Sequence, residues 1–276
     1  MGLLAVSRRR SALARAAGFL VSAEAVLVCS GAGMSADAGV PVYRGPDGMY
    51  DETVDRDGFT AQERASALRF FDDPEGSAVW SAERWKALRA AEPHAGYRIL
   101  AALGRRLPGG IFVYTSNVDG MGQRAGLRDE DTVERHGSYA WSQCLQRCGT
   151  GVFPTTDPDF GRAVCPGCGA TSRPNVLMFD DFGFREDRLA AQFDRFAGWL
   201  DRAAMRGPSR VVVLEVGAGI GLPTIRNKAV GLSRTENWPL IRVNLHEAQP
   251  PENGVVVAGR AAAVLVALGK RIGIAA

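Results

Sequence analysis

Short apolar runs recur along the chain, and glycine or small polar residues follow most of them. Continuous runs rich in β-branched residues are typical of strands that are buried on both faces of a sheet. The pattern therefore predicts five strands: Ala25–Cys29, Ile111–Tyr114, Val211–Val216, Leu240–Val243 and Val255–Ala258.

Segments with apolar residues at helical spacing lie between these runs. The predicted helices are 8–22, Glu92–Leu103, Arg188–Met205 and Arg260–Leu268. We interpret 8–22 as a helix and not as a targeting peptide, because it continues directly into the first strand. Alternating strands and helices predict an α/β fold, a Rossmann-like, mostly parallel sheet with helices on both faces. Ligands of such sheets bind beyond the carboxyl ends of the strands.

Two segments interrupt the alternation. Residues 46–90 are polar and carry two tryptophans, and residues 138–180 carry four cysteines. We predict that both pack together as a small second domain, a helical insert with a zinc module. The Rossmann-like domain then comprises 1–45, 91–137 and 181–276.

Composition excludes several classes of function. The net charge of +3 over 276 residues gives no basic surface of the kind that nucleic acid requires, so no nucleic-acid partner is expected. The chain contains no uninterrupted apolar run of membrane-spanning length, so no membrane partner is expected. We predict a cytoplasmic protein.

A glycine loop directly follows the first predicted strand. Gly31, Gly33 and Ala36 match G-x-G-x-x-[GA], in which glycines let the backbone approach a pyrophosphate at a helix N-terminus. A dehydrogenase would carry an acid at the end of the second strand for the ribose, and this chain has none there. The loop therefore predicts dinucleotide binding outside the dehydrogenase class.

The cysteine spacing predicts a metal site. Cys144, Cys148, Cys165 and Cys168 form C-x₃-C-x₁₆-C-x₂-C. Thiolates at this spacing can close a tetrahedral zinc site, and four cysteines leave no open position for a reacting molecule. The expected cofactor is a structural zinc ion.

Motifs along nearly the whole chain resemble those of the sirtuins. GAGMSADAGVPVYRG (31–45) is similar to the sirtuin GAGxSxxxGIPxFRG, YTSNVDG (114–120) to TQNIDxL, and ERHG (134–137) to ExHG. The four-cysteine module, RPNVLMFDD (173–181, family RPxVVxFGE), VLEVGAGIGLP (213–223) and RVNLHE (242–247) follow in the family's order. Ser116, Asp180, Ala218 and Gly219 depart from the family's usual Gln, Gly, Thr and Ser.

The resemblance implies a role for each matched residue. Asn117 and Asp119 would orient nicotinamide, and His136 would be the general base. Val176, Met178 and Phe179 would pair with the substrate peptide. The residues that would bind the cofactor are Gly31, Ala32, Gly33, Ser35, Tyr43, Arg44, Ser116, Gly217, Ala218, Gly219, Asn244 and Ala261.

The activity implied by the resemblance is NAD-dependent removal of acyl groups from protein lysine, with an acylated protein or peptide as partner. NAD would be a co-substrate: the acyl oxygen attacks the ribose as nicotinamide leaves, and the product is O-acyl-ADP-ribose. Two alternatives stay open. One is ADP-ribosyl transfer to protein or NAD hydrolysis, and the other is a non-catalytic sensor of NAD or ADP-ribose.

Overall fold

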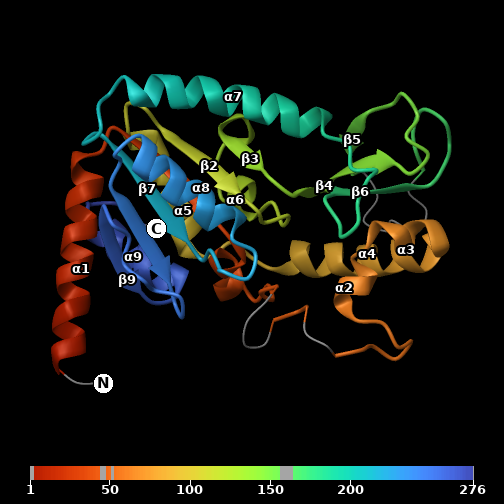
Figure 1. The fold of residues 1–276 in the computed structure, drawn as a ribbon, viewed down its shortest axis with the longest axis horizontal. Coiled ribbons are helices and arrows are strands. Elements are labelled where there is room, and N and C mark those ends of the chain that lie inside the picture. The colour runs from red at the N-terminus through yellow and green to blue at the C-terminus, as the bar shows by residue number, and fades with distance from the viewer. Residues whose placement is uncertain (1–2, 44–47, 51–52, 156–163, 276) are drawn as a thin grey trace.

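The computed structural model describes residues 3–43, 48–50, 53–155 and 164–275, and for residues 3–6 it describes the backbone only. These residues form a larger part around a six-stranded sheet and a smaller part beside it (Figure 1). The six strands are parallel, in the order β3 (Thr132–Glu134), β2 (Ile111–Thr115), β1 (Ala25–Ser30), β7 (Val211–Val216), β8 (Leu240–Asn244) and β9 (Gly254–Ala258).

Alternate strand residues point to opposite sides of this sheet. Because both sets are mostly apolar in the central strands, helices cover both faces. Val26 and Val28 of β1 pack with α1 (Leu3–Ser22), α5 (Ala95–Arg106) and α9 (Ala261–Arg271). Leu27 and Cys29 pack on the other face with α7 (Asp187–Ala204) and α8 (Thr224–Thr235). The predicted Rossmann-like fold is confirmed.

The smaller part joins two segments that are distant in sequence. One contributes helices α2 (Ala61–Arg64), α3 (Ala67–Asp72) and α4 (Pro74–Ala90). The other contributes an antiparallel sheet of β5 (Val152–Pro154), β4 (Gly137–Cys144) and β6 (Ser172–Val176). Trp85 of α4 stacks on Tyr139 of β4 with ring centroids 6.0 Å apart, which packs the two segments together. The exact residue boundaries predicted for the two domains stay a prediction.

The five predicted strands and four predicted helices are all present, with ends that differ by a few residues. Strand β3, helix α8 and the three-stranded sheet were not predicted from the sequence. Within the described ranges, no helix is long and apolar enough to cross a membrane.

Candidate active site

The carboxyl ends of β1 and β2 bring three predicted site residues together. Ser35 follows β1 in the glycine loop, and Asn117 and Asp119 follow β2; all three are buried. The Ser35 hydroxyl donates to Asp119 Oδ2 at 2.6 Å and accepts from Asn117 Nδ2 at 2.9 Å. Asp119 Oδ1 accepts from the Met121 N–H at 2.9 Å. The Oδ1 atom of Asn117 is buried and has no hydrogen-bond partner among the described residues.

The glycines of two loops touch each other directly. Gly33 donates its N–H to the Gly217 carbonyl at 3.0 Å, and Gly31 donates to the Val216 carbonyl at the same distance. A Cβ on Gly33 would lie 2.8 Å from Gly217 Cα, and one on Gly217 would lie 2.3 Å from Gly33 C. Gly217 also has φ of 63°, which disfavours other residues. These glycines are therefore required for contact between the loops after β1 and β7.

His136 lies between β3 and β4 and is half-buried. Its backbone carbonyl accepts the N–H of Leu177, so the histidine adjoins the segment 176–179. Burial, with the nearby Arg135 charge, lowers the pKa of His136 to about 4. At neutral pH the imidazole is therefore neutral, the state that a general base needs.

The lowered pKa of His136 predicts the acid limb of the pH profile. A base is active above its pKa, so a pKa below the ordinary 6.5 moves the loss of activity to lower pH. We expect kcat/KM to hold through pH 6.5 and to fall only towards pH 4. Arg135→Gln removes a charge that lowers this pKa, so the limb should move to higher pH. A limb centred at pH 6.5 or above in the unmodified protein would contradict this assignment.

The loops after β7 and β8 are joined at Ala218. Its buried carbonyl accepts from Asn244 Nδ2 at 2.9 Å and from Arg226 at 2.8 Å. Asn244 Oδ1 accepts the N–H groups of His246 and Glu247, at 3.2 and 3.3 Å. Gly219, which follows Ala218, is exposed. Asn244 thus shapes the edge of the site through backbone groups.

The remaining predicted cofactor residues lie around the same edge. Ala32 is half-buried in the glycine loop, and Ser116 donates its backbone N–H to the Ser30 carbonyl at 3.1 Å. Ala261 begins α9, and Asp37 of the glycine loop accepts the next N–H of that helix, from Ala262, at 2.8 Å.

Tyr43 extends the site towards the smaller part. Its ring stacks on Tyr50 with centroids 5.3 Å apart, and the Arg84 guanidinium carbon lies 5.7 Å from its centroid. Tyr50 in turn meets Phe179 edge to face at 5.2 Å. Arg44, also predicted to bind the cofactor, lies outside the described residues.

The predicted substrate strand continues from β6. Val176, Met178 and Phe179 are half-exposed. Phe179 donates its N–H to the Ala65 carbonyl at 3.1 Å, and its own carbonyl accepts from Ala67 at 2.9 Å. The backbone N–H and C=O of Phe179 are thus bound by the helical insert. In an extended chain, successive residues direct their N–H and C=O groups to alternate sides.

Asp180, which stands where sirtuins usually have glycine, has φ of 53°. The backbone therefore keeps the left-handed conformation that glycine adopts without cost, and a side chain there costs about 1 kcal/mol. We expect Asp180→Gly to raise the free energy of unfolding by up to about 1 kcal/mol. Denaturant unfolding measures it, with Asp180→Ala as the comparison that should destabilise.

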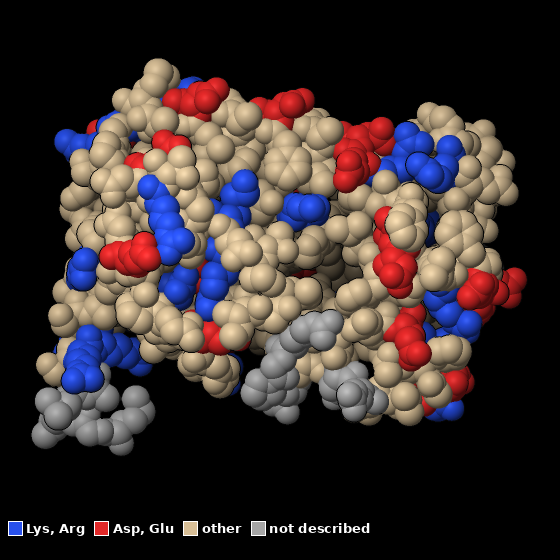
Figure 2. Space-filling model, in the orientation of Figure 1, with Lys and Arg blue, Asp and Glu red and all other residues tan. Residues whose placement is uncertain are grey.

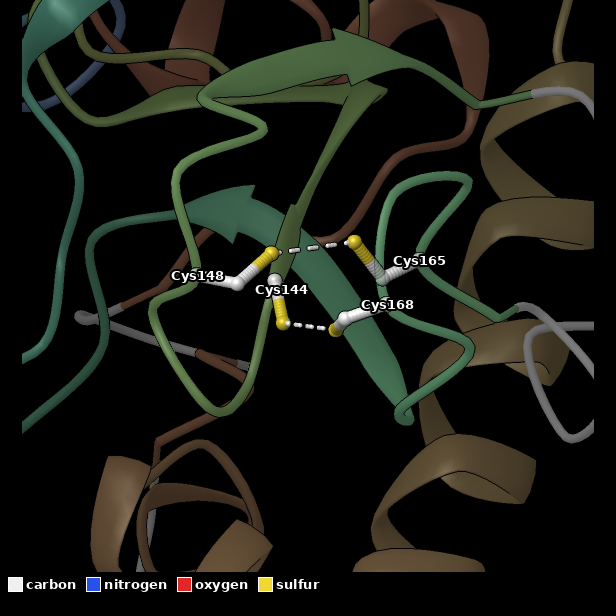
Figure 3. Close-up of side chains that lie close together, drawn as sticks. All are labelled: Cys144, Cys148, Cys165 and Cys168. Carbon is white, nitrogen blue, oxygen red and sulfur yellow. Dashed lines mark hydrogen bonds between the residues drawn. The ribbon is translucent and has the colours of Figure 1, made fainter.

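The four cysteines converge at one end of the small sheet. Figure 3 shows their sulfurs pointing towards one another. The Sγ atoms of Cys144 and Cys168 lie 3.6 Å apart, those of Cys148 and Cys165 lie 3.4 Å apart, and all four lie within 4.8 Å of one another. A tetrahedral zinc ion with Zn–S of about 2.3 Å separates its sulfurs by about 3.8 Å. The cluster is compatible with a structural zinc ion.

The site residues also fit NAD. The unpartnered Asn117 Oδ1 is an acceptor, as the carboxamide N–H₂ of nicotinamide requires. The face of the molecule is hollowed between the larger and the smaller part (Figure 2). The glycine loop follows β1 at the carboxyl edge of the sheet, where ligands of parallel sheets bind.

Two residues at the start of α5 contact the glycine loop and were not among the predicted site residues. Tyr97 Oη lies 2.8 Å from Ser35 Oγ, and His94 Nε2 lies 2.8 Å from the Met34 carbonyl oxygen. Tyr97 belongs to the apolar face of its helix, so its pattern is that of a core residue. Only the proximity of the glycine loop distinguishes it.

The chain belongs to the Sir2 family, whose model matches residues 31–195. It is 33% identical over 219 residues to the NAD-dependent protein deacylase of Deinococcus radiodurans, across 78% of this chain and 84% of that protein. It is 35% identical over 173 residues to NAD-dependent protein deacylase 2 of Pseudomonas aeruginosa. That match covers 62% of this chain and 66% of the relative, slightly under two thirds of its length.

Solved structures share the fold. A Sir2 homologue in complex with NAD has a TM-score of 0.71 and 23% identity, across 94% of this chain and 93% of its own. A Sir2 structure with a deacetylated peptide and 3′-O-acetyl ADP-ribose has a TM-score of 0.71 and 21% identity, across 95% and 99%. These likenesses agree with the Rossmann-like fold described above.

Proposed function

We propose that this protein removes acyl groups from lysine side chains of proteins or peptides in an NAD-dependent reaction. One acyl-lysine, one NAD and one water give lysine, nicotinamide and O-acyl-ADP-ribose. The observation that carries the proposal is the position of His136, a half-buried histidine beside the segment 176–179 and at the sheet edge that holds Asn117 and Asp119. Burial lowers the pKa of its imidazole, which favours the neutral form that a base requires. Two relatives named as NAD-dependent protein deacylases support it.

Each group has a role in this proposal. NAD supplies the ADP-ribosyl group, with nicotinamide as its leaving group. Asn117 accepts from the nicotinamide carboxamide through Oδ1, and Asp119 holds the loop through Ser35 and Met121. His136 accepts the proton of a ribose hydroxyl.

The binding surfaces follow from the same geometry. The glycine loop, Ser116, Ala218, Gly219, Asn244 and Ala261 would hold the dinucleotide. Tyr43 would shield the reacting ribose, and Val176, Met178 and Phe179 would line the peptide. Zinc would stabilise the smaller part, and its four reduced thiolates favour a reducing compartment such as the cytoplasm.

Nicotinamide release tests the proposal. Purified protein is incubated with NAD, with and without an acetyl-lysine peptide, and released nicotinamide is quantified. We expect release that depends on the peptide and is lost with the unacetylated peptide. Equal release without peptide would favour NAD hydrolysis or ADP-ribosyl transfer; NAD binding without release, for acetyl and longer acyl chains alike, would favour the sensor.

A further inference from the structure

We infer that Tyr97 is a positioning residue for nicotinamide: through Ser35, its hydroxyl holds the orientation in which Asn117 presents its carboxamide oxygen. The inference rests on the proposed function and adds a residue from outside the sequence motifs.

The Ser35 hydroxyl has one proton and two lone pairs. Its proton goes to Asp119 Oδ2, the shortest of its contacts at 2.6 Å. The Tyr97 hydroxyl at 2.8 Å and Asn117 Nδ2 at 2.9 Å must therefore both donate to it. Burial raises the pKa of Tyr97, which keeps its hydroxyl protonated as a donor.

The orientation of Asn117 follows from this count. A flipped amide would place Oδ1 against a Ser35 oxygen that has no proton left to donate. The amide is therefore held with Nδ2 towards Ser35, and Oδ1 faces away without a partner among the described residues. A fixed acceptor is what recognition of a carboxamide requires, because a preorganised group loses less entropy on binding.

Tyr97 holds this arrangement from a separate element. Asn117 and Asp119 lie on the loop after β2, whereas Tyr97 lies in the first turn of α5. Its ring contacts His94, with centroids 4.8 Å apart. His94 Nδ1 accepts the Gly96 N–H at 3.0 Å, so Nε2 carries the proton and donates to the Met34 carbonyl.

Two neighbouring residues of the glycine loop, Met34 and Ser35, are thus bound to the start of α5. Tyr97 is 5% exposed and Ser35 is 1% exposed, so bulk water does not compete for these bonds. Without the Tyr97 hydroxyl, Ser35 keeps only its two partners on the β2 loop. The Ser35 hydroxyl and the Asn117 amide bound to it then lose the bond that fixes them relative to α5.

Paired affinities for NAD and ADP-ribose test the inference, because ADP-ribose lacks only the nicotinamide. We expect Tyr97→Phe to weaken NAD about fivefold in titration calorimetry, as for one lost hydrogen bond of about 1 kcal/mol. Its affinity for ADP-ribose should stay within about twofold. In turnover assays, KM for NAD and the half-inhibitory concentration of nicotinamide should rise together, with KM for the peptide unchanged.

Ser233→Ala is the matched control. It also removes a buried hydroxyl bond, to the Trp238 carbonyl at 2.7 Å, on α8 away from the β1 and β2 loops. It should lower the melting temperature without changing either affinity. Equal weakening of NAD and ADP-ribose by Tyr97→Phe, or a melting-temperature loss alone, would overturn the inference. These affinities need no turnover, so a failure of the proposed function would be seen separately.

Discussion

Replacement of His136 by alanine should reduce acyl-peptide turnover by about 10²–10⁴-fold, the usual contribution of a general base. His136 is half-buried with a lowered pKa, so its imidazole is neutral at pH 7, and it adjoins the segment that would hold the peptide. No other histidine can replace it, because His94 is bound to the Met34 carbonyl and His246 is exposed beyond β8. Steady-state turnover with an acetyl-lysine peptide measures the loss.

His246→Ala is the control for this variant and should retain turnover, since its side chain is exposed. Zinc content and the melting temperature should be close to those of the unmodified protein in both variants. Turnover of His136→Ala within a few-fold of the unmodified protein would remove the histidine from the mechanism.

Loss of one zinc ligand should unfold the smaller part. The four cysteines connect β4 to the turn before β6, and structural zinc sites contribute about 10–16 kcal/mol of binding energy to folding. We expect Cys165→Ser to lose its zinc, lower the melting temperature and abolish turnover. Metal analysis by mass spectrometry measures the zinc content, near-ultraviolet circular dichroism followed on heating measures the melting temperature, and the acetyl-lysine peptide assay measures turnover.

Cys29→Ala separates this effect from general loss of a buried thiol. Cys29 is fully buried in β1 and is not among the four cysteines whose sulfurs lie within 4.8 Å of one another. This variant should be less stable yet keep one zinc ion per chain. A stoichiometric zinc ion in Cys165→Ser, with an unchanged melting temperature, would contradict the assignment.

The sequence predicted the parallel sheet because its strands are buried on both faces and therefore read as continuous apolar runs. It missed β3, since Thr132–Glu134 is three residues long, and β4, whose sequence GSYAWSQC is mostly polar. Helix α8 was missed because TIRNKAVGLSRT carries few apolar residues. Such elements depend on pairing and packing with distant segments, which local periodicity does not encode.

Some residues of the candidate site could be predicted from the sequence, but the contacts between them could not. Asn117 and Asp119 stand out as polar residues after a buried strand, and their shared bonding to Ser35 needs the parallel register of β1 and β2. Gly33 was predicted from its expected approach to a pyrophosphate, and the structure adds its contact with Gly217. Tyr97 could not be predicted, because its position on an apolar helix face is that of a core residue.

The stoichiometry of the products tests the central claim most directly. The protein is incubated with NAD and an acetyl-lysine peptide, and mass spectrometry quantifies free-lysine peptide, nicotinamide and O-acetyl-ADP-ribose. We expect equal amounts of all three throughout the reaction. Nicotinamide accompanied by free ADP-ribose or ADP-ribosylated protein, with the peptide still acetylated, would contradict it.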